Sequence, residues 1–215
     1  MVPKTVKSTI KTQGFIAIVQ RLNLANRLPS ENSYSNEDVI LHPEKFVNYG
    51  FSIYPSQGEL IYLLCRAIGA KRVIDFATSL GMSALYFAAA MKDNGGGQVF
   101  GSELVSEKAK IAMTNLEGAG LQQYVDIKVG DARRTLRTVD GPIDFALIDG
   151  WPGNEGVSLA REVMEIITPK LRVGALIMND NGEPDFMEYI HNPRNGFISI
   201  SLPIKTTTEL AMKLF

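Results

Sequence analysis

Five acidic residues stand where short apolar runs of the chain end. Asp75, Glu103, Asp131, Asp149 and Asp180 each lie at, or just beyond, the carboxyl end of such a run. Because the carboxyl ends of parallel strands meet at one edge of a sheet, these side chains are predicted to share one rim. Like charges on one edge repel, so the rim predicts a cationic ligand. Any single acid of this kind would equally well be a helix cap or a solvated turn.

The apolar runs alternate with helical patterns. Strands are predicted at 72–77, 98–103, 124–129, 143–149 and 171–178, and helices at 55–68, 81–91, 106–117, 132–138 and 155–167. Short strands that alternate with helices are typical of a parallel sheet covered on both faces. Strands at 197–202 and 207–214 are too close for a crossover, so they are predicted to pair antiparallel. The predicted fold class is α/β, a doubly wound, mostly parallel seven-stranded sheet with an antiparallel C-terminal edge hairpin.

Composition and charge exclude several classes of protein. The chain has 215 residues, 45% of them apolar, and 22 basic against 23 acidic side chains, which argues against disorder and against a dedicated nucleic-acid binder. No apolar run approaches the roughly 20 residues of a membrane helix, and 15–19 is too short for the core of an export signal. The single cysteine, Cys65, forms no intrachain disulfide and is expected to be a core thiol in a reducing compartment. A cytoplasmic protein without membrane contact is expected.

The N-terminal residues 1–30 carry five basic side chains and no acidic one. One interpretation is a contact to RNA or to an anionic substrate. A solvated extension whose helix, at about 14–27, covers one edge of the domain is favoured, because no aromatic residues interleave with the bases as a stacking platform requires. Residues 30–38 are predicted to be a loop. The expected organisation is a basic arm with covering helices at 1–50 and a cofactor-binding domain at 51–215.

The turn after the first strand, Asp75 to Ser83, discriminates between cofactors. Its only glycine is Gly81, so it lacks the glycine spacing with which a dinucleotide enzyme approaches a pyrophosphate. A cofactor that has a ribose and a positive charge but no phosphates fits an acidic rim better. S-adenosylmethionine is such a molecule, and Glu103 at the end of the second strand is placed to bind its ribose diol.

Several segments together carry a family resemblance. They are Pro55-Ser56-Gln57-Gly58, the turn 75–83, Gly130-Asp131-Ala132, 144–151, 173–181 and Leu202-Pro203-Ile204. In this order and spacing, the chain resembles the class I S-adenosylmethionine-dependent O-methyltransferases, in particular the metal-dependent catechol and caffeoyl-CoA type. The resemblance covers about residues 50–215. It implies a Rossmann-like fold, a small-molecule hydroxyl acceptor such as a catechol or phenol, a Mg²⁺ or similar ion, and a homodimer.

The resemblance also implies roles for individual residues. Asp149, Asp180 and Asn181 would be the metal ligands and the catalytic residues, and hard oxygen ligands of this kind suit Mg²⁺. Asp149-Gly150 and Asn181-Gly182 are equally good turn dipeptides. The implied cofactor-binding residues are Ile53, Asp75, Ala77, Thr78, Ser79, Gly81, Ser83, Glu103, Leu104, Gly130, Asp131, Ala132, Asp149 and Trp151.

The chain departs from the family pattern at a few positions. Asp75 and Ala77 stand where the family usually has Glu and Gly, and Pro152 stands where catechol-type members have a lysine base. Lys205, in the last turn, is a weak candidate for that base. These departures leave open a metal-independent methyltransferase that acts on nitrogen or RNA, or a cofactor-binding protein without turnover.

Overall fold

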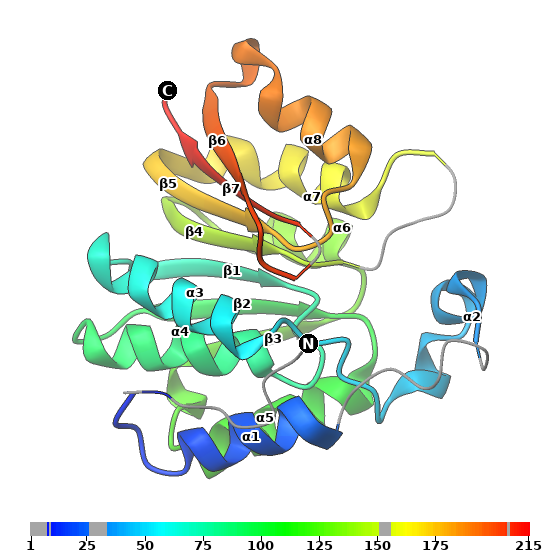
Figure 1. Cartoon of the computed structure of the whole chain (residues 1–215), viewed down its shortest axis with the longest axis vertical. Coiled ribbons are helices and arrows are strands. Elements are labelled where there is room, and N and C mark those ends of the chain that lie inside the picture. Colours follow the sequence, from blue (N-terminus) through cyan, green and yellow to red (C-terminus); the bar gives the residue numbers. More distant parts are fainter. Residues whose placement is uncertain (1–7, 9, 26–33, 151–155, 206) are drawn as a thin grey trace.

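A computed structural model describes residues 8, 10–25, 34–150, 156–205 and 207–215 of the chain. Its centre is one seven-stranded sheet with the strand order β3-β2-β1-β4-β5-β7-β6 (Figure 1). The first five strands pair in parallel, and β7 pairs antiparallel with both β5 and β6. The predicted fold class, with its C-terminal edge hairpin, is therefore confirmed. The strands are β1 Arg72–Phe76, β2 Gln98–Glu103, β3 Val125–Val129, β4 Ile143–Ile148, β5 Leu171–Asn179, β6 Phe197–Leu202 and β7 Thr208–Lys213.

Helices cover both faces of this sheet. The α-helices are α1 Phe15–Ala25, α2 Asn36–Leu41, α3 Pro55–Ala67, α4 Met82–Asp93, α5 Ser106–Gly118, α6 Ala132–Thr135, α7 Leu159–Ile167 and α8 Pro184–His191. Short 3₁₀ turns lie at Pro43–Phe46, Gln122–Tyr124, Leu136–Thr138, Thr168–Lys170 and Pro193–Asn195. Side chains alternate across each strand, so Val73 and Leu147 pack with α1, α3, α4 and α5, whereas Ile74 and Ile148 pack with α6, α7 and α8. Two apolar cores thus lie on the two faces of the sheet, between it and the two helical layers.

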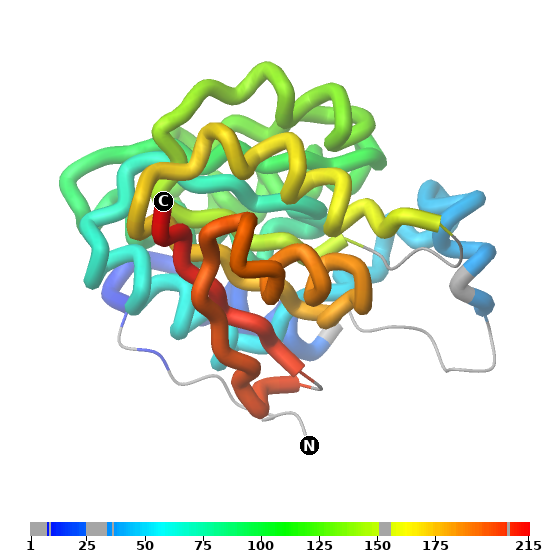
Figure 2. The backbone as a smooth tube through the Cα atoms, turned by 90° about the horizontal axis from the view of Figure 1, so that it is seen from above, coloured from blue at the N-terminus to red at the C-terminus, as the bar shows by residue number. Residues whose placement is uncertain are grey.

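The parallel strands all end on one side of the molecule. In Figures 1 and 2, α2 lies on this side and stands off from the sheet. The segment 30–38 was predicted to be a loop, but α2 begins within it. Ser35 and Asp38 form a capping box there, in which each side chain accepts a hydrogen bond from the other residue's backbone N–H, at 3.1 and 2.8 Å. The helix α8 was not predicted either.

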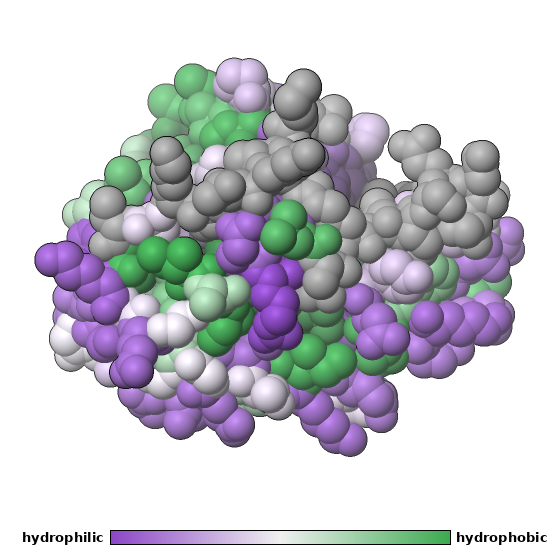
Figure 3. Space-filling view, turned by 60° about the horizontal axis from the view of Figure 1, so that its bottom comes forward, coloured by the Kyte–Doolittle hydropathy of each residue, from purple (hydrophilic) through white to green (hydrophobic). Residues whose placement is uncertain are grey.

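The N-terminal helix α1 is part of the main body. Phe15, Val19 and Leu22 are buried against α4 and α5, while Ile16 and Leu24 are exposed. On the face that carries α1 and α5, hydrophobic and hydrophilic side chains are interspersed (Figure 3). Among the described residues, none of the helices combines the length and the apolar character needed to cross a membrane.

The contact between α3 and α4 depends on a glycine. A Cβ atom at Gly58 would lie 2.2 Å from ring carbons of the fully buried Tyr86. We expect Gly58→Ala to lower the free energy of unfolding by about 1–3 kcal/mol, because overpacking outweighs the better helix propensity of alanine. Urea denaturation measures it. Ser56→Ala, at an exposed position in the same turn, is the control and should leave stability within about 0.5 kcal/mol. A Gly58→Ala variant as stable as the wild type would show that the two helices do not pack this closely.

Candidate functional site

Four of the five predicted rim acids act on one another at the carboxyl edge of the sheet. Asp75 lies in β1, Glu103 ends β2, and Asp149 and Asp180 directly follow β4 and β5. Burial and the Asp180 carboxylate raise the pKa of Asp149 well above its usual value. Asp131 follows β3 at the same edge, so all five acids lie on the predicted rim. Asp131 differs, because its carboxylate caps α6 and forms an ion pair with Arg133 at 2.7 Å.

The carboxylate of Asp75 is fully buried and unpartnered. Its side chain has no exposed surface, and neither oxygen makes a hydrogen bond with any described residue. Burial raises its pKa to about 6, although the nearby hydroxyls of Ser83 and Thr78 oppose the shift. A buried carboxylate without a hydrogen bond is costly, so a bound donor or cation would stabilise Asp75.

Glu103 ties together two loops above the sheet. Its carboxylate accepts hydrogen bonds from the backbone N–H groups of Ser79, at 2.8 Å, and Val105, at 2.9 Å. Each oxygen keeps a second lone-pair direction for another donor. The side chain is only 7% exposed. Glu103 is therefore a fixed acceptor rather than a mobile surface acid.

The turn between β1 and α4 has an unusual backbone. Ala77 (φ 64°), Ser79 (φ 50°) and Gly81 (φ 91°) all adopt left-handed conformations. This conformation explains why the family usually has glycine at the position of Ala77, since a Cβ is disfavoured there. The turn is held by Thr78 Oγ1, which donates to Asp75 O at 3.0 Å, and by Ser79 Oγ, which donates to Gly50 O at 2.6 Å. The strain and these bonds preset the loop that faces the rim.

A buried lysine beside Glu103 was missed by the sequence reasoning. Lys108, in α5, is 5% exposed, and its ammonium lies 4.5 Å from the ring centroid of Phe51. Burial lowers its pKa to about 8, while the charge of Glu103 opposes that shift. A lysine in the first turn of a helix usually points into solvent, so the sequence contained no signal for this contact.

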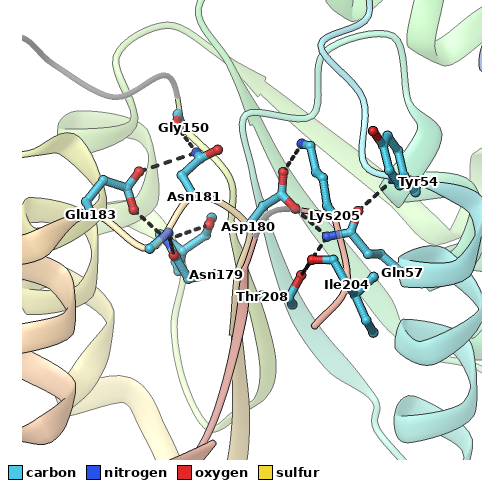
Figure 4. A network of polar contacts seen from close by, with 12 residues as sticks. Tyr54, Gln57, Gly150, Asn179, Asp180, Asn181, Glu183, Ile204, Lys205 and Thr208 are labelled. Carbon is cyan, nitrogen blue, oxygen red and sulfur yellow. Dashed lines mark hydrogen bonds and ion pairs between the residues drawn. The ribbon is translucent and has the colours of Figure 1, made fainter. Parts of the chain in front are cut away.

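The carboxylate of Asp180 is the centre of a buried hydrogen-bond network (Figure 4). Gln57 Nε2 donates to Asp180 Oδ1 and, at 3.0 Å, to Thr208 Oγ1. Gln57 Oε1 in turn accepts from Tyr54 N at 2.7 Å, and Thr208 Oγ1 donates to Ile204 O at 3.0 Å. Gln57, Asp180 and Thr208 are at most 2% exposed. The first turn of α3 and the start of β7 therefore fix the orientation of Asp180.

The second oxygen of Asp180 is held by a cation of the chain itself. Lys205 Nζ forms an ion pair with Asp180 Oδ2, and the lysine side chain is 26% exposed (Figure 4). Burial alone would lower the pKa of Lys205, but the carboxylates of Asp149 and Asp180 outweigh it and raise the pKa. Lys205 was predicted only as a weak candidate for a base. The structure brings it instead onto a predicted metal ligand.

Asn181, the third predicted metal ligand, ties the ends of β4 and β5 together. Its Nδ2 donates to Gly150 O at 2.7 Å and to Glu183 Oε1 at 3.3 Å. The neighbouring Asn179 binds the end of β4 in the same way, through Ile148 O at 3.1 Å. Gly182, in a left-handed conformation, donates to Asn179 Oδ1 at 2.6 Å. The chain therefore bends at Asn181-Gly182, as expected for a turn dipeptide.

The other predicted cofactor residues lie around this edge with different exposure. Ile53 is buried in the core with α3 and α4, and Leu104 is 59% exposed beside Glu103. Gly130 N donates to Glu103 O at 2.8 Å, and Ala132 opens α6. Trp151 and Pro152 lie outside the described residues. In the described part of the chain, no group of three or more His, Cys, Asp or Glu side chains is arranged to hold a metal ion.

Residues 78–182 match a family model described as a methyltransferase domain. The chain is 30% identical over 160 residues to tricin synthase 2 of Oryza sativa subsp. japonica. This alignment covers 71% of this chain and 52% of that protein. It is also 30% identical over 141 residues to a catechol O-methyltransferase of Mycobacterium tuberculosis. That alignment covers 62% of this chain and 63% of the relative. The chain thus spans less than two thirds of the length of either relative.

Solved structures with the same fold include two O-methyltransferases. One, from Bacillus cereus in complex with SAH, matches with a TM-score of 0.65 and 21% identity over 86% of this chain and 93% of its own. The other, TomG from Streptomyces achromogenes in complex with SAM, matches with a TM-score of 0.65 and 19% identity over 97% of this chain and 100% of its own. These structures share the fold of this chain. The sequence matches show that it is similar to O-methyltransferases of the catechol and caffeoyl-CoA type, as the resemblance implied.

Proposed function

We propose that the protein transfers a methyl group from S-adenosylmethionine to the hydroxyl of a small molecule. The observation that carries the proposal is the fully buried, unpartnered carboxylate of Asp75 at the carboxyl edge of the sheet. A sulfonium nucleoside with an amino group supplies the positive charge that this carboxylate lacks, whereas a phosphate would be repelled by it. Relatives named as O-methyltransferases of catechol and of caffeoyl-CoA support the reaction class.

The chain's residues would divide the binding of this cofactor. Asp75, with the preset turn 77–81 above it, would hold the cationic methionine end. Glu103, already fixed by two backbone N–H groups, would accept hydrogen bonds from the ribose hydroxyls through its remaining lone pairs. Leu104, exposed directly beside Glu103, would cover the adenine. Trp151 lies outside the described residues, and its contact with the adenine remains a prediction.

When bound, the cofactor supplies an electrophilic methyl group. In the transfer, the C–S bond breaks with its electron pair left on sulfur, a C–O bond forms to the acceptor oxygen, and the hydroxyl proton leaves to water. The chain's contribution is to align the sulfonium, the methyl and the acceptor oxygen and to exclude competing nucleophiles. Asp149 follows β4, which lies beside β1, and Asp180 follows β5 on the far side of β4, so the acceptor would lie between these acids and the turn 77–81.

The residues as arranged do not fit the predicted Mg²⁺ ion. Asp149, Asp180 and Asn181 offer hard oxygen ligands, but Gln57 donates to one oxygen of Asp180 and the ammonium of Lys205 lies against the other. A divalent ion would have to displace the ammonium of Lys205 from the same carboxylate. The proposed reaction therefore includes no step through a metal.

We expect Glu103→Gln to weaken the binding of S-adenosylmethionine about 10- to 100-fold, because a charge-assisted hydrogen bond to the ribose, worth roughly 1.5–3 kcal/mol, is lost. Isothermal titration calorimetry measures the affinity, and the melting temperature of the free variant reports on the fold. Glu107→Gln, at the exposed start of α5, is the matched control and should bind as the wild type does. An unchanged affinity in Glu103→Gln would place the ribose elsewhere.

The raised pKa of Asp75 predicts how binding depends on pH. The carboxylate attracts the cofactor only when ionised, and with a pKa of about 6 the ionised fraction grows roughly tenfold between pH 5 and pH 7. The affinity for S-adenosylmethionine should therefore rise by about that factor over this range. Calorimetry at several pH values tests this, and a flat profile would remove Asp75 from the binding site.

The same residue should reduce the stability of the ligand-free protein. The pKa of Asp75 is higher in the folded than in the unfolded chain, so stability is lost as the pH rises from about 4 through 6. Asp75→Asn should raise the free energy of unfolding at pH 8 by on the order of 1–3 kcal/mol, and by less at pH 5. Urea denaturation at both pH values is the measurement, with Asp140→Asn as an exposed control. An equal effect at the two pH values would contradict the assignment.

A further inference from the structure

Lys205 lies where the family resemblance predicts a metal ion. Its Nζ contacts Asp180, a predicted ligand, and its charge also acts on Asp149, another predicted ligand. The two acids follow adjacent strands, so a cation beside them reduces the repulsion between their carboxylates. In this chain a side chain meets that requirement, and the negative charge of the site is partly neutralised before any ligand arrives.

The backbone of Lys205 is a second, independent observation. The residue has φ 59°, in the left-handed region that L side chains rarely adopt. Glycine or asparagine would fit this position in the β6–β7 turn with less strain. Strained residues persist where the surrounding structure holds them and often mark functional sites. A lysine therefore stands at a position whose left-handed backbone disfavours it.

The surroundings hold Asp180 in the orientation that meets this lysine. Gln57 occupies one carboxylate oxygen and is itself bound to Tyr54 N and Thr208 Oγ1, so the other oxygen faces Lys205 (Figure 4). Gln57 and Thr208 have no exposed surface. The Lys205 side chain keeps about a quarter of its surface exposed, and an ammonium has three donor hydrogens. One side of the cation is anchored and another side is accessible from solvent.

We propose that the ammonium of Lys205 is the resident cation of this site, which excludes a divalent ion and binds the oxygen of the methyl acceptor. This inference rests on the proposed function and names a positioning group for it. One N–H of the ammonium stays on Asp180, and another donates to the acceptor oxygen. The positive charge favours the oxyanion that attacks the methyl group, while the hydroxyl proton leaves to water. The lysine stem fixes the direction from which the acceptor approaches.

A metal-binding measurement tests whether Lys205 excludes a divalent ion, and it does not depend on methyl transfer. Mn²⁺ is titrated into the full chain and followed by electron paramagnetic resonance. We expect no binding below 1 mM in the wild type, and binding at least tenfold tighter in Lys205→Gly, which frees Asp180 and relieves the left-handed backbone. Lys110→Met, at a 77% exposed position in α5, should behave as the wild type does. Binding of Mn²⁺ to the wild type below 1 mM that Asp180→Asn abolishes, or no gain of binding in a folded Lys205→Gly variant, would overturn the proposal.

Kinetics test the positioning role, with catechol as the acceptor and EDTA present. Lys205→Met should lower kcat/KM for catechol at least 100-fold, while the calorimetric affinity for S-adenosylmethionine stays within threefold. Lys205→Arg, which keeps the charge, should recover part of the loss. Wild-type turnover by Lys205→Met, or equal losses in the methionine and arginine variants, would contradict the role. If the wild type binds no S-adenosylmethionine, the proposed function fails, and the Mn²⁺ titration still decides whether Lys205 is the resident cation.

Discussion

Repulsion among buried carboxylates is the constraint on which the edge of this sheet depends. A doubly wound fold brings the ends of its strands together, and here four of those ends carry acids that act on one another. Three of these acids differ in the partners of their negative charge. Backbone N–H groups hold Glu103, an ammonium and an amide hold Asp180, and Asp75 has no partner among the described residues. The site therefore combines a preset acceptor, an internal ion pair and an unmet charge, and the unmet charge supports a cationic ligand.

The fold and its acidic rim were predictable because both follow from local pattern. The alternation of apolar runs and helical segments predicted the ends of the strands to within one residue. The short connection at 203–206 predicted the edge hairpin. Asp75, Glu103, Asp149 and Asp180 were placed by the general rule that parallel strands end on one side. The helix α2 was missed because its capping box lies in a polar stretch that reads as a loop.

The partners of these acids were not predictable, because they are contributed by distant parts of the chain. Gln57 meets Asp180 across 123 positions, and Lys205 reaches it from a turn whose backbone conformation the sequence does not reveal. A residue pattern indicates which side chains could be ligands, but not whether another side chain already occupies them. That is why the sequence predicts a metal site at Asp149, Asp180 and Asn181. In the structure the ammonium of Lys205 contacts Asp180 and acts on Asp149, and the Asn181 amide binds Gly150 O.

The cation of the site is carried by a surface turn rather than by the apolar cores. The β6–β7 turn connects β6 and β7 at one edge of the sheet, and its residues belong to neither of the two apolar cores. In evolution, a single codon in such a turn is enough to exchange a tethered charge for an open coordination position, or the reverse. Dependence on an inorganic ion would then be a trait that closely related lineages gain and lose independently of their shared architecture.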